Sequence, residues 1–201
     1  MIIALYFVIY LVIAGLAIWT KYFSPKLFQI AKPLPLLLLI IYSLVSSQHY
    51  FLVLALAFSF LGDILLLKKE KYFIEGLISF LLAHLFFIAL FIEHKSNPNV
   101  FVGIIVIVIG LFYFGYLKKY LGKFLFPVLL YLTVITLMVI FAIGINSGNR
   151  SIIGVGAGLF FISDGVLAFN KFVKKFKLAD AIVLLTYYLA QLLLIYGISV
   201  K

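Results

Sequence analysis

Apolar residues fill the chain in long runs separated by short polar segments. Counted against the roughly 20 apolar residues that cross a bilayer, these runs predict eight helices, and we expect an all-α, polytopic membrane protein. The runs cover Ile2 to Thr20, Pro33 to Ser46, Phe51 to Leu67, Phe73 to Ile92, Asn99 to Leu117, Phe124 to Ile145, Ser151 to Asn170 and Leu178 to Ser199. The joining segments are short, so residues 1–201 are expected to form a single transmembrane domain.

Composition excludes a water-soluble fold. The 201 residues are 67% hydrophobic and only 11% charged, whereas soluble domains carry roughly 25% charged residues. Helices suit the bilayer because they satisfy their own backbone hydrogen bonds where no water is present. The chain has no cysteine, which rules out disulfides, thiolate metal sites and cysteine nucleophiles.

The basic residues predict an orientation. Loops after odd-numbered spans hold 13 Lys residues, against 3 Lys or Arg residues on the other side. Because short cytoplasmic loops are rich in Lys and Arg, we expect these loops inside and both termini outside, in a bacterial inner (cytoplasmic) membrane. This placement also accounts for the net charge of +10, and we expect no nucleic-acid partner. The first group is Lys21, Lys26, Lys32, Lys68, Lys69, Lys71, Lys118, Lys119, Lys123, Lys171, Lys174, Lys175 and Lys177, and the second is Lys95, Arg150 and Lys201.

The two halves of the sequence resemble each other locally. Residues 60–66, FLGDILL, match residues 161–167, FISDGVL, and residues 82–85, LAHL, match residues 189–192, LAQL. Spans three and seven would both run from outside to inside. A parallel four-plus-four repeat, with an axis along the membrane normal, is therefore one interpretation, and such repeats occur in transporters.

Asp63 and Asp164 are the candidate working groups. Each lies inside a predicted span at similar depth, where a charge costs a few kcal/mol and must face a cavity or a partner. Two carboxyl groups sharing a cavity of low dielectric constant do not both ionise readily, so one can serve as acid and the other as base. A purely structural pairing with a lysine is the alternative.

Other polar residues within the spans are weaker candidates. His84 is the only histidine inside a span, and it is either a hydrogen-bonded structural residue or one that orients substrate. Gln191 occupies the matching position in the second half, one turn from Tyr188. Asp63, His84 and Asp164 are suitable metal ligands by type, but the HxxxH kind of spacing is lacking, so we expect no metal and no cofactor. Gly154 and Gly158 are expected to let their helix pack closely on a neighbour.

A series of short motifs extends in order over about 170 residues. The motifs are Lys32-Pro33, Gly62-Asp63, Phe73-x-x-Gly76 with Phe80 and Ala83-His84, Pro127 with Tyr131, Ser163-Asp164, and Tyr188-x-Ala190-Gln191. In their order and their eight-span setting, these motifs resemble the YhhN-like lysoplasmalogenase family of eight-helix membrane proteins.

The resemblance implies hydrolysis of the vinyl ether bond of a lysoplasmalogen drawn from the bilayer. The products would be a fatty aldehyde and glycerophosphoethanolamine or glycerophosphocholine. Asp63 and Asp164 would then be the catalytic acid and base, in an order left open. Substrate-binding roles would fall to Lys32, His84, Tyr131, Ser163, Tyr188 and Gln191, with Lys32 facing the lipid phosphate.

Two other functional classes fit the same residues. A proton-coupled transporter of small solutes or lipids would also show paired membrane aspartates and parallel repeats. A lipid-binding or scaffold protein would need the aspartates only for stability or partner binding. Release of aldehyde from an alkenyl lysolipid separates the hydrolase from both.

Overall fold

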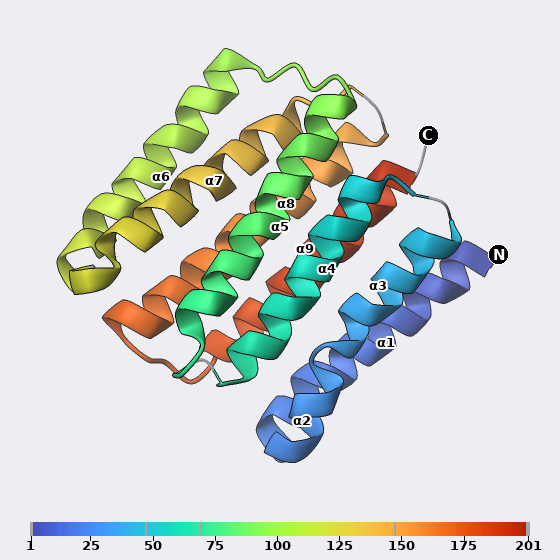
Figure 1. Ribbon diagram of the computed structural model, residues 1–201, viewed down its shortest axis with the longest axis horizontal. Coiled ribbons are helices and arrows are strands. Elements are labelled where there is room, and N and C mark those ends of the chain that lie inside the picture. Colours follow the sequence, from blue (N-terminus) through green and yellow to red (C-terminus); the bar gives the residue numbers. More distant parts are fainter. Residues whose placement is uncertain (1, 47, 69, 147, 200–201) are drawn as a thin grey trace. The chain divides into compact units, whose positions relative to one another are not determined.

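The computed structural model describes residues 2–46, 48–68, 70–146 and 148–199, with backbone only for residues 2–4. In this part of the chain every regular element is a helix (Figure 1), which confirms the all-α expectation. The α-helices are α1 (Ile2–Phe23), α2 (Pro25–Ala31), α3 (Leu34–Val45), α4 (Tyr50–Leu65), α5 (Phe73–Glu93), α6 (Val100–Leu121), α7 (Leu125–Ile143), α8 (Arg150–Ala168) and α9 (Ala179–Ser199). Short extensions are the 3₁₀ turns η1 (Leu66–Lys68) and η2 (Gly122–Phe124) and the π-helix η3 (Phe169–Val173).

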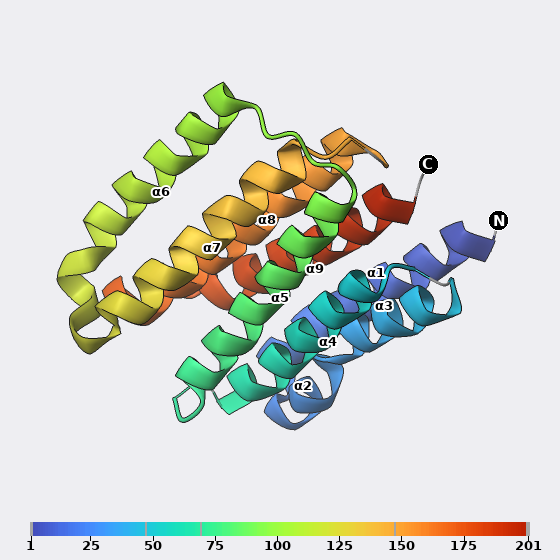
Figure 2. The same ribbon diagram turned by 45° about the horizontal axis from the view of Figure 1, so that its top comes forward.

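Within the described ranges, seven helical segments are long and apolar enough to cross a membrane. One of them, Val100–Ile143, has 44 residues and contains both α6 and α7. Gly122 has a φ of +49°, a backbone conformation that favours glycine, and the chain reverses there. The two helices lie side by side in both views (Figures 1 and 2). This one segment therefore supplies two spans, and the multi-pass architecture agrees with the eight predicted runs.

The second span begins earlier than predicted. We expected a helix from Pro33, but α2 already begins at Pro25, after Ser24, whose side chain accepts a hydrogen bond from the Leu27 amide. Ser before Pro is a strong helix start, because the hydroxyl caps a free amide and proline suits the first turn. Lys32 and Pro33 then separate α2 from α3, since proline interrupts the helical hydrogen-bond ladder.

The chain divides into two compact units, with the boundary between Phe86 and Phe87 inside α5. The first unit contains α1 to α4 and most of α5, and α3 packs on both α1 and α4. Its core consists of fully buried side chains such as Tyr10, Leu36 and Leu52. The single transmembrane domain and the parallel repeat stay predictions.

In the second unit, α8 packs against α9 at very short range. A Cβ atom added to Gly156 would lie 3.1 Å from the Ala190 carbonyl oxygen and 3.1 Å from Leu194, whereas one added to Gly158 meets nothing within 4 Å. The close contact with α9 thus involves Gly156, together with Gly197 of α9, whose added Cβ would lie 2.5 Å from Ile153. Of the pair that the sequence spacing indicated, Gly154 does face a neighbour, since its Cβ would lie 3.3 Å from Ile143 of α7, and Gly158 does not. Helix α7 packs on α8, and α6 packs on α7 and η3.

Basic residues of the second unit gather at one end. Leu117, Leu121 and Val128 form a buried cluster with Phe172, so the Lys-rich ends of α6 and η3 lie together. At the opposite end, the Arg150 guanidinium donates to the Ile143 carbonyl. Lysines gathered at one end of the helices are what the orientation rule requires. The assignment of that end to the cytoplasmic side of the membrane stays a prediction. Lys69 and Lys201, which entered the count, lie outside the described residues.

Candidate active site

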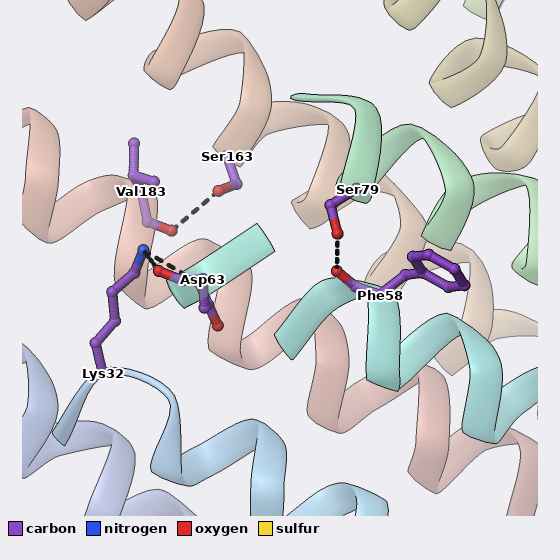
Figure 3. A network of polar contacts seen from close by, with 6 residues as sticks. All are labelled: Lys32, Phe58, Asp63, Ser79, Ser163 and Val183. Atoms are coloured by element: carbon purple, nitrogen blue, oxygen red, sulfur yellow. Dashed lines mark hydrogen bonds and ion pairs between the residues drawn. The ribbon is translucent and has the colours of Figure 1, made fainter. Parts of the chain in front are cut away.

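Lys32 and Asp63 form a buried ion pair in the first unit. The Lys32 Nζ atom lies 3.3 Å from Asp63 Oδ1 and donates to the Asp63 carbonyl oxygen at 2.9 Å (Figure 3). Only 7% of Lys32 and 2% of Asp63 are exposed. Two residues that are 31 positions apart in sequence are thus brought together, and the cost of burying each charge is offset by the other.

The local fold explains why Asp63 needs this cation. Asp63 lies in the last turn of α4, where the unpaired carbonyls give the helix end a partial negative charge. A carboxylate there is unfavourable unless a cation is also present. Lys32 sits just beyond α2 and supplies that charge while satisfying one of the terminal carbonyls.

Neighbouring contacts fix the position of α4. The Ser79 hydroxyl on α5 donates to the Phe58 carbonyl at 2.6 Å (Figure 3). Gly62 leaves space that the Phe80 ring fills, since a Cβ there would lie 2.6 Å from that ring. On α1, the fully buried Tyr10 interacts electrostatically with Asp63. Helix α5 therefore fixes α4, and Lys32 binds Asp63 directly.

Asp164 has a different partner, in the second unit. The Tyr131 hydroxyl on α7 donates a hydrogen bond to Asp164 Oδ2 on α8. Tyr131 is buried, and Asp164 is of intermediate exposure because it lines a cavity. The packing of α7 on α8 places these two side chains together.

The cavity beside Asp164 has a volume of about 30 Å³, which is enough for a water molecule. Tyr131 and Asp164 supply polar groups, and the remaining lining is mostly apolar, including Val128, Ile135 and Phe161. The arrangement places a carboxyl group, a phenol and room for water within a membrane-spanning helix bundle. This is a suitable setting for proton transfer to or from a bound lipid.

Three other candidates also lie in the second unit. The Ser163 hydroxyl donates to the Val183 carbonyl at 3.0 Å (Figure 3), which links α8 to α9 and gives Ser163 a structural bond. Tyr188 and Gln191 are buried on α9, and the Tyr188 ring packs against Tyr187 with centroids 5.4 Å apart. Their predicted contacts with substrate stay predictions.

His84 is fully buried in α5, in the first unit. Within the described ranges, no three His, Asp or Glu side chains form a group able to hold a metal ion. The described polar contacts include the Lys32–Asp63 pair in the first unit and the Tyr131–Asp164 hydrogen bond in the second.

Tyr113 is a residue that the sequence did not single out. The Tyr113 hydroxyl on α6 donates to the Gly165 carbonyl at 2.5 Å, next to Asp164. Tyr113 also lines the Asp164 cavity. Nothing in its sequence position distinguishes it from Tyr116 or Tyr120, because the contact depends on how α6 packs.

Comparison with known proteins identifies the family. The family model described as the YhhN family matches residues 27–198, which include Lys32, Asp63, Tyr131 and Asp164. The chain belongs to the YhhN family. The matched range contains both buried centres, so the resemblance found in the sequence motifs is confirmed.

Curated relatives in the YhhN family are named lysoplasmalogenase TMEM86B. The mouse protein is 33% identical over 151 residues, which are 75% of this chain and 64% of the relative. The rat protein is 31% identical over 166 residues, or 81% of this chain and 68% of the relative, and the human protein 31% over 140 residues, or 70% and 59%. The chain thus spans about two thirds or less of the relatives' length. No solved structure matches it significantly.

Proposed function

We propose that this chain is a lysoplasmalogenase, which hydrolyses the vinyl ether bond of a lysoplasmalogen within the bilayer. Its products would be a fatty aldehyde and glycerophosphoethanolamine or glycerophosphocholine. The name of its relatives supports this activity. The observation that carries it is the Tyr131–Asp164 hydrogen bond beside a water-sized cavity among membrane-spanning helices.

The chemistry requires one acid, one base and one water molecule. A carboxylic acid protonates the chain-side carbon of the vinyl ether, and the resulting oxocarbenium ion is stabilised by a nearby negative charge. Water adds to the cation and gives its proton to a carboxylate, forming a hemiacetal. The hemiacetal then separates into aldehyde and alcohol, so that the overall reaction consumes one water.

The two aspartates have partners that favour different roles. Asp63 is paired with a lysine ammonium, which suits a group that works as a carboxylate. Asp164 lines a mostly apolar cavity, and these surroundings suit the acid. The Tyr131 hydroxyl donates to Oδ2 and fixes the carboxyl group, so that the transferred proton would be carried on Oδ1. We therefore assign Asp164 as the acid, and Asp63 as the base or cation-stabilising group.

The remaining predicted residues are assigned to substrate binding. His84, Tyr188 and Gln191 are buried polar groups on α5 and α9 that would contact the glycerol backbone. Lys32, whose ammonium is paired with Asp63, would act on the lipid phosphate only indirectly, through that pair. Ser163 would act by fixing α9 next to Asp164, through its bond to Val183.

Location and requirements follow from the same proposal. The protein would lie in a bacterial inner membrane with both termini outside, and the Lys-rich ends of its helices would face the cytoplasm. Aspartate acid and base catalysis needs no metal and no cofactor.

Purified protein incubated with ester, alkyl ether and alkenyl ether lysolipids tests this function. Only the alkenyl ether should release aldehyde, and a chelator should leave the rate unchanged. Because general acid or base catalysis contributes about 10²–10⁴-fold, Asp164→Asn and Asp63→Asn should each lose activity on that scale. Glu93→Gln, an exposed carboxylate at the end of α5, is the matched control.

Two outcomes would contradict the proposal. Full hydrolysis by both Asp→Asn variants would exclude the aspartates as acid and base. Proton uptake into liposomes coupled to a solute, without any lipid cleavage, would identify a transporter instead.

A further inference from the structure

An apolar groove lies between α6 and α8 in the second unit. Its volume is about 500 Å³, within the roughly 300–1,000 Å³ of small-molecule sites. The lining residues are Val108, Ile109, Phe112, Tyr113, Phe161, Ile162, Gly165 and Val166. Helix α6 packs on α7 and η3, and in both views its middle stands away from α8 (Figures 1 and 2).

The groove is open toward the surroundings of the helices. Val108 is 57% exposed, Phe112 82% and Ile162 50%. In a membrane-spanning helix, exposed apolar side chains at mid-helix face lipid rather than water. A hydrocarbon chain can therefore enter this groove sideways from the bilayer.

The groove adjoins the Asp164 cavity. Three residues, Tyr113, Phe161 and Gly165, line both spaces. The cavity extends from there toward the Lys-rich end of the unit, where Leu117 and Ala168 line it. A molecule lying along α6 would thus meet, in order, the apolar groove, Asp164 and the basic helix ends.

We propose that this groove binds the hydrocarbon chain of a single-chain phospholipid, with the chain running along α6 away from Asp164. This inference rests on the proposed function and specifies how its substrate is held. The phosphate end lies toward Lys118, Lys119 and Lys171 at the basic end of the unit. The chain-side carbon of the vinyl ether, which must be protonated, then lies at the junction formed by Tyr113 and Gly165, next to Asp164.

Photolabelling tests this placement without requiring turnover. The probes are two alkyl ether lysophosphocholines, which cannot be cleaved as vinyl ethers, with a diazirine either at the chain end or beside the ether oxygen. The chain-end probe should label α6 at or before Val108, toward the N-terminal end of the helix at Val100, and the ether-end probe the segment around Tyr113 and Gly165. Excess unlabelled lysolipid should remove this labelling, whereas the same amount of a two-chain phospholipid should not.

A matched pair of variants checks that the groove itself is occupied. Ile162→Trp fills the groove, whereas Val155→Trp places the same ring on the same face of α8, two turns away, at a position that is 57% exposed and outside the lining. Ile162→Trp should lower chain-end labelling and raise KM for a long-chain alkenyl substrate about tenfold, which corresponds to excluding roughly two methylene groups from apolar surface. Val155→Trp should change neither quantity.

The outcomes separate this inference from the proposed function. If the protein releases no aldehyde from any alkenyl lysolipid but the labelling pattern holds, the groove binds single-chain lipid and the proposed function fails. If aldehyde is released but labelling is spread over all helices, is not reduced by lysolipid, or is equal in Ile162→Trp and Val155→Trp, the groove is ordinary lipid-facing surface. Any one of these three labelling results overturns the inference.

Discussion

Removing the Lys32 ammonium should destabilise the protein far more than removing an exposed lysine. Lys32→Met keeps the length of the side chain and its apolar stem but leaves the Asp63 carboxylate without its cation. Asp63 is 2% exposed and lies in the last turn of α4, where the helix end is already negative. It must then either stay charged in an apolar site or take up a proton.

The magnitude follows from the burial of both partners. Breaking a buried ion pair by removing one member costs about 3–5 kcal/mol, and the bond at 2.9 Å from Nζ to the Asp63 carbonyl is lost as well. We expect Lys32→Met to lower the free energy of unfolding by about 3–5 kcal/mol. Lys26→Met is the control, because Lys26 is an exposed residue of the neighbouring α2 and should change stability by less than about 0.5 kcal/mol.

Reversible unfolding in mixed micelles, followed by circular dichroism, measures these differences. The double variant Lys32→Met with Asp63→Asn removes both charges, so it should regain much of the loss. A coupling energy of roughly 1.5–3 kcal/mol is expected, as for hydrogen bonds to charged groups. Equal stability of Lys32→Met and Lys26→Met, or a double variant no more stable than Lys32→Met, would refute the ion-pair argument.

Three further predictions concern the second unit. Tyr131→Phe removes the hydroxyl that donates to Asp164. It should lower kcat for alkenyl lysolipid at least about tenfold while circular dichroism shows an unchanged fold. An unchanged kcat would show that this hydrogen bond does not contribute to the reaction. Gly156→Ala should lower the thermal unfolding temperature because its Cβ would crowd α9, and Gly158→Ala should not, since its Cβ meets nothing within 4 Å; equal shifts would contradict the close α8–α9 contact. Because the chain has no cysteine, Lys174→Cys should react with an impermeant maleimide only from the cytoplasmic side, and reaction from outside would invert the proposed topology.

Much of the helical architecture could be predicted because membrane spans follow a simple physical rule. A run of apolar residues long enough to cross the bilayer must be helical, and the predicted run from Phe73 to Ile92 corresponds closely to α5 (Phe73–Glu93). The start of α2 was missed because Ser24 and Pro25 lie among lysines in an apparent loop. The capping signal of Ser24 and Pro25 is local, and it lies outside the apolar run on which the predicted span depends.

Side-chain partners were harder to predict than helices. Lys32 was expected at the lipid phosphate, and its bond to Asp63 depends on how the segment after α2 approaches the end of α4. The Gly156 contact similarly depends on which face of α8 meets α9. The spacing of Gly154 and Gly158 shows that they share one face of the helix, but not which neighbouring helix that face meets. The sequence does not indicate the hydrogen bond from Tyr113 to Gly165, because Tyr113, Tyr116 and Tyr120 all lie in similar apolar surroundings along α6.

The sequence alone does not predict that the two aspartates have different partners. Their surrounding residues match between the halves, so the sequence treats Asp63 and Asp164 as equivalent members of one acid and base pair. Packing gives them unlike partners, a lysine ammonium for Asp63 and a tyrosine hydroxyl for Asp164. A full positive charge offsets the burial of a carboxylate more strongly than a hydrogen bond from a neutral phenol does. The proposed division of roles, with Asp164 as the acid and Asp63 as the base, therefore depends on side chains that lie outside the matching segments 60–66 and 161–167.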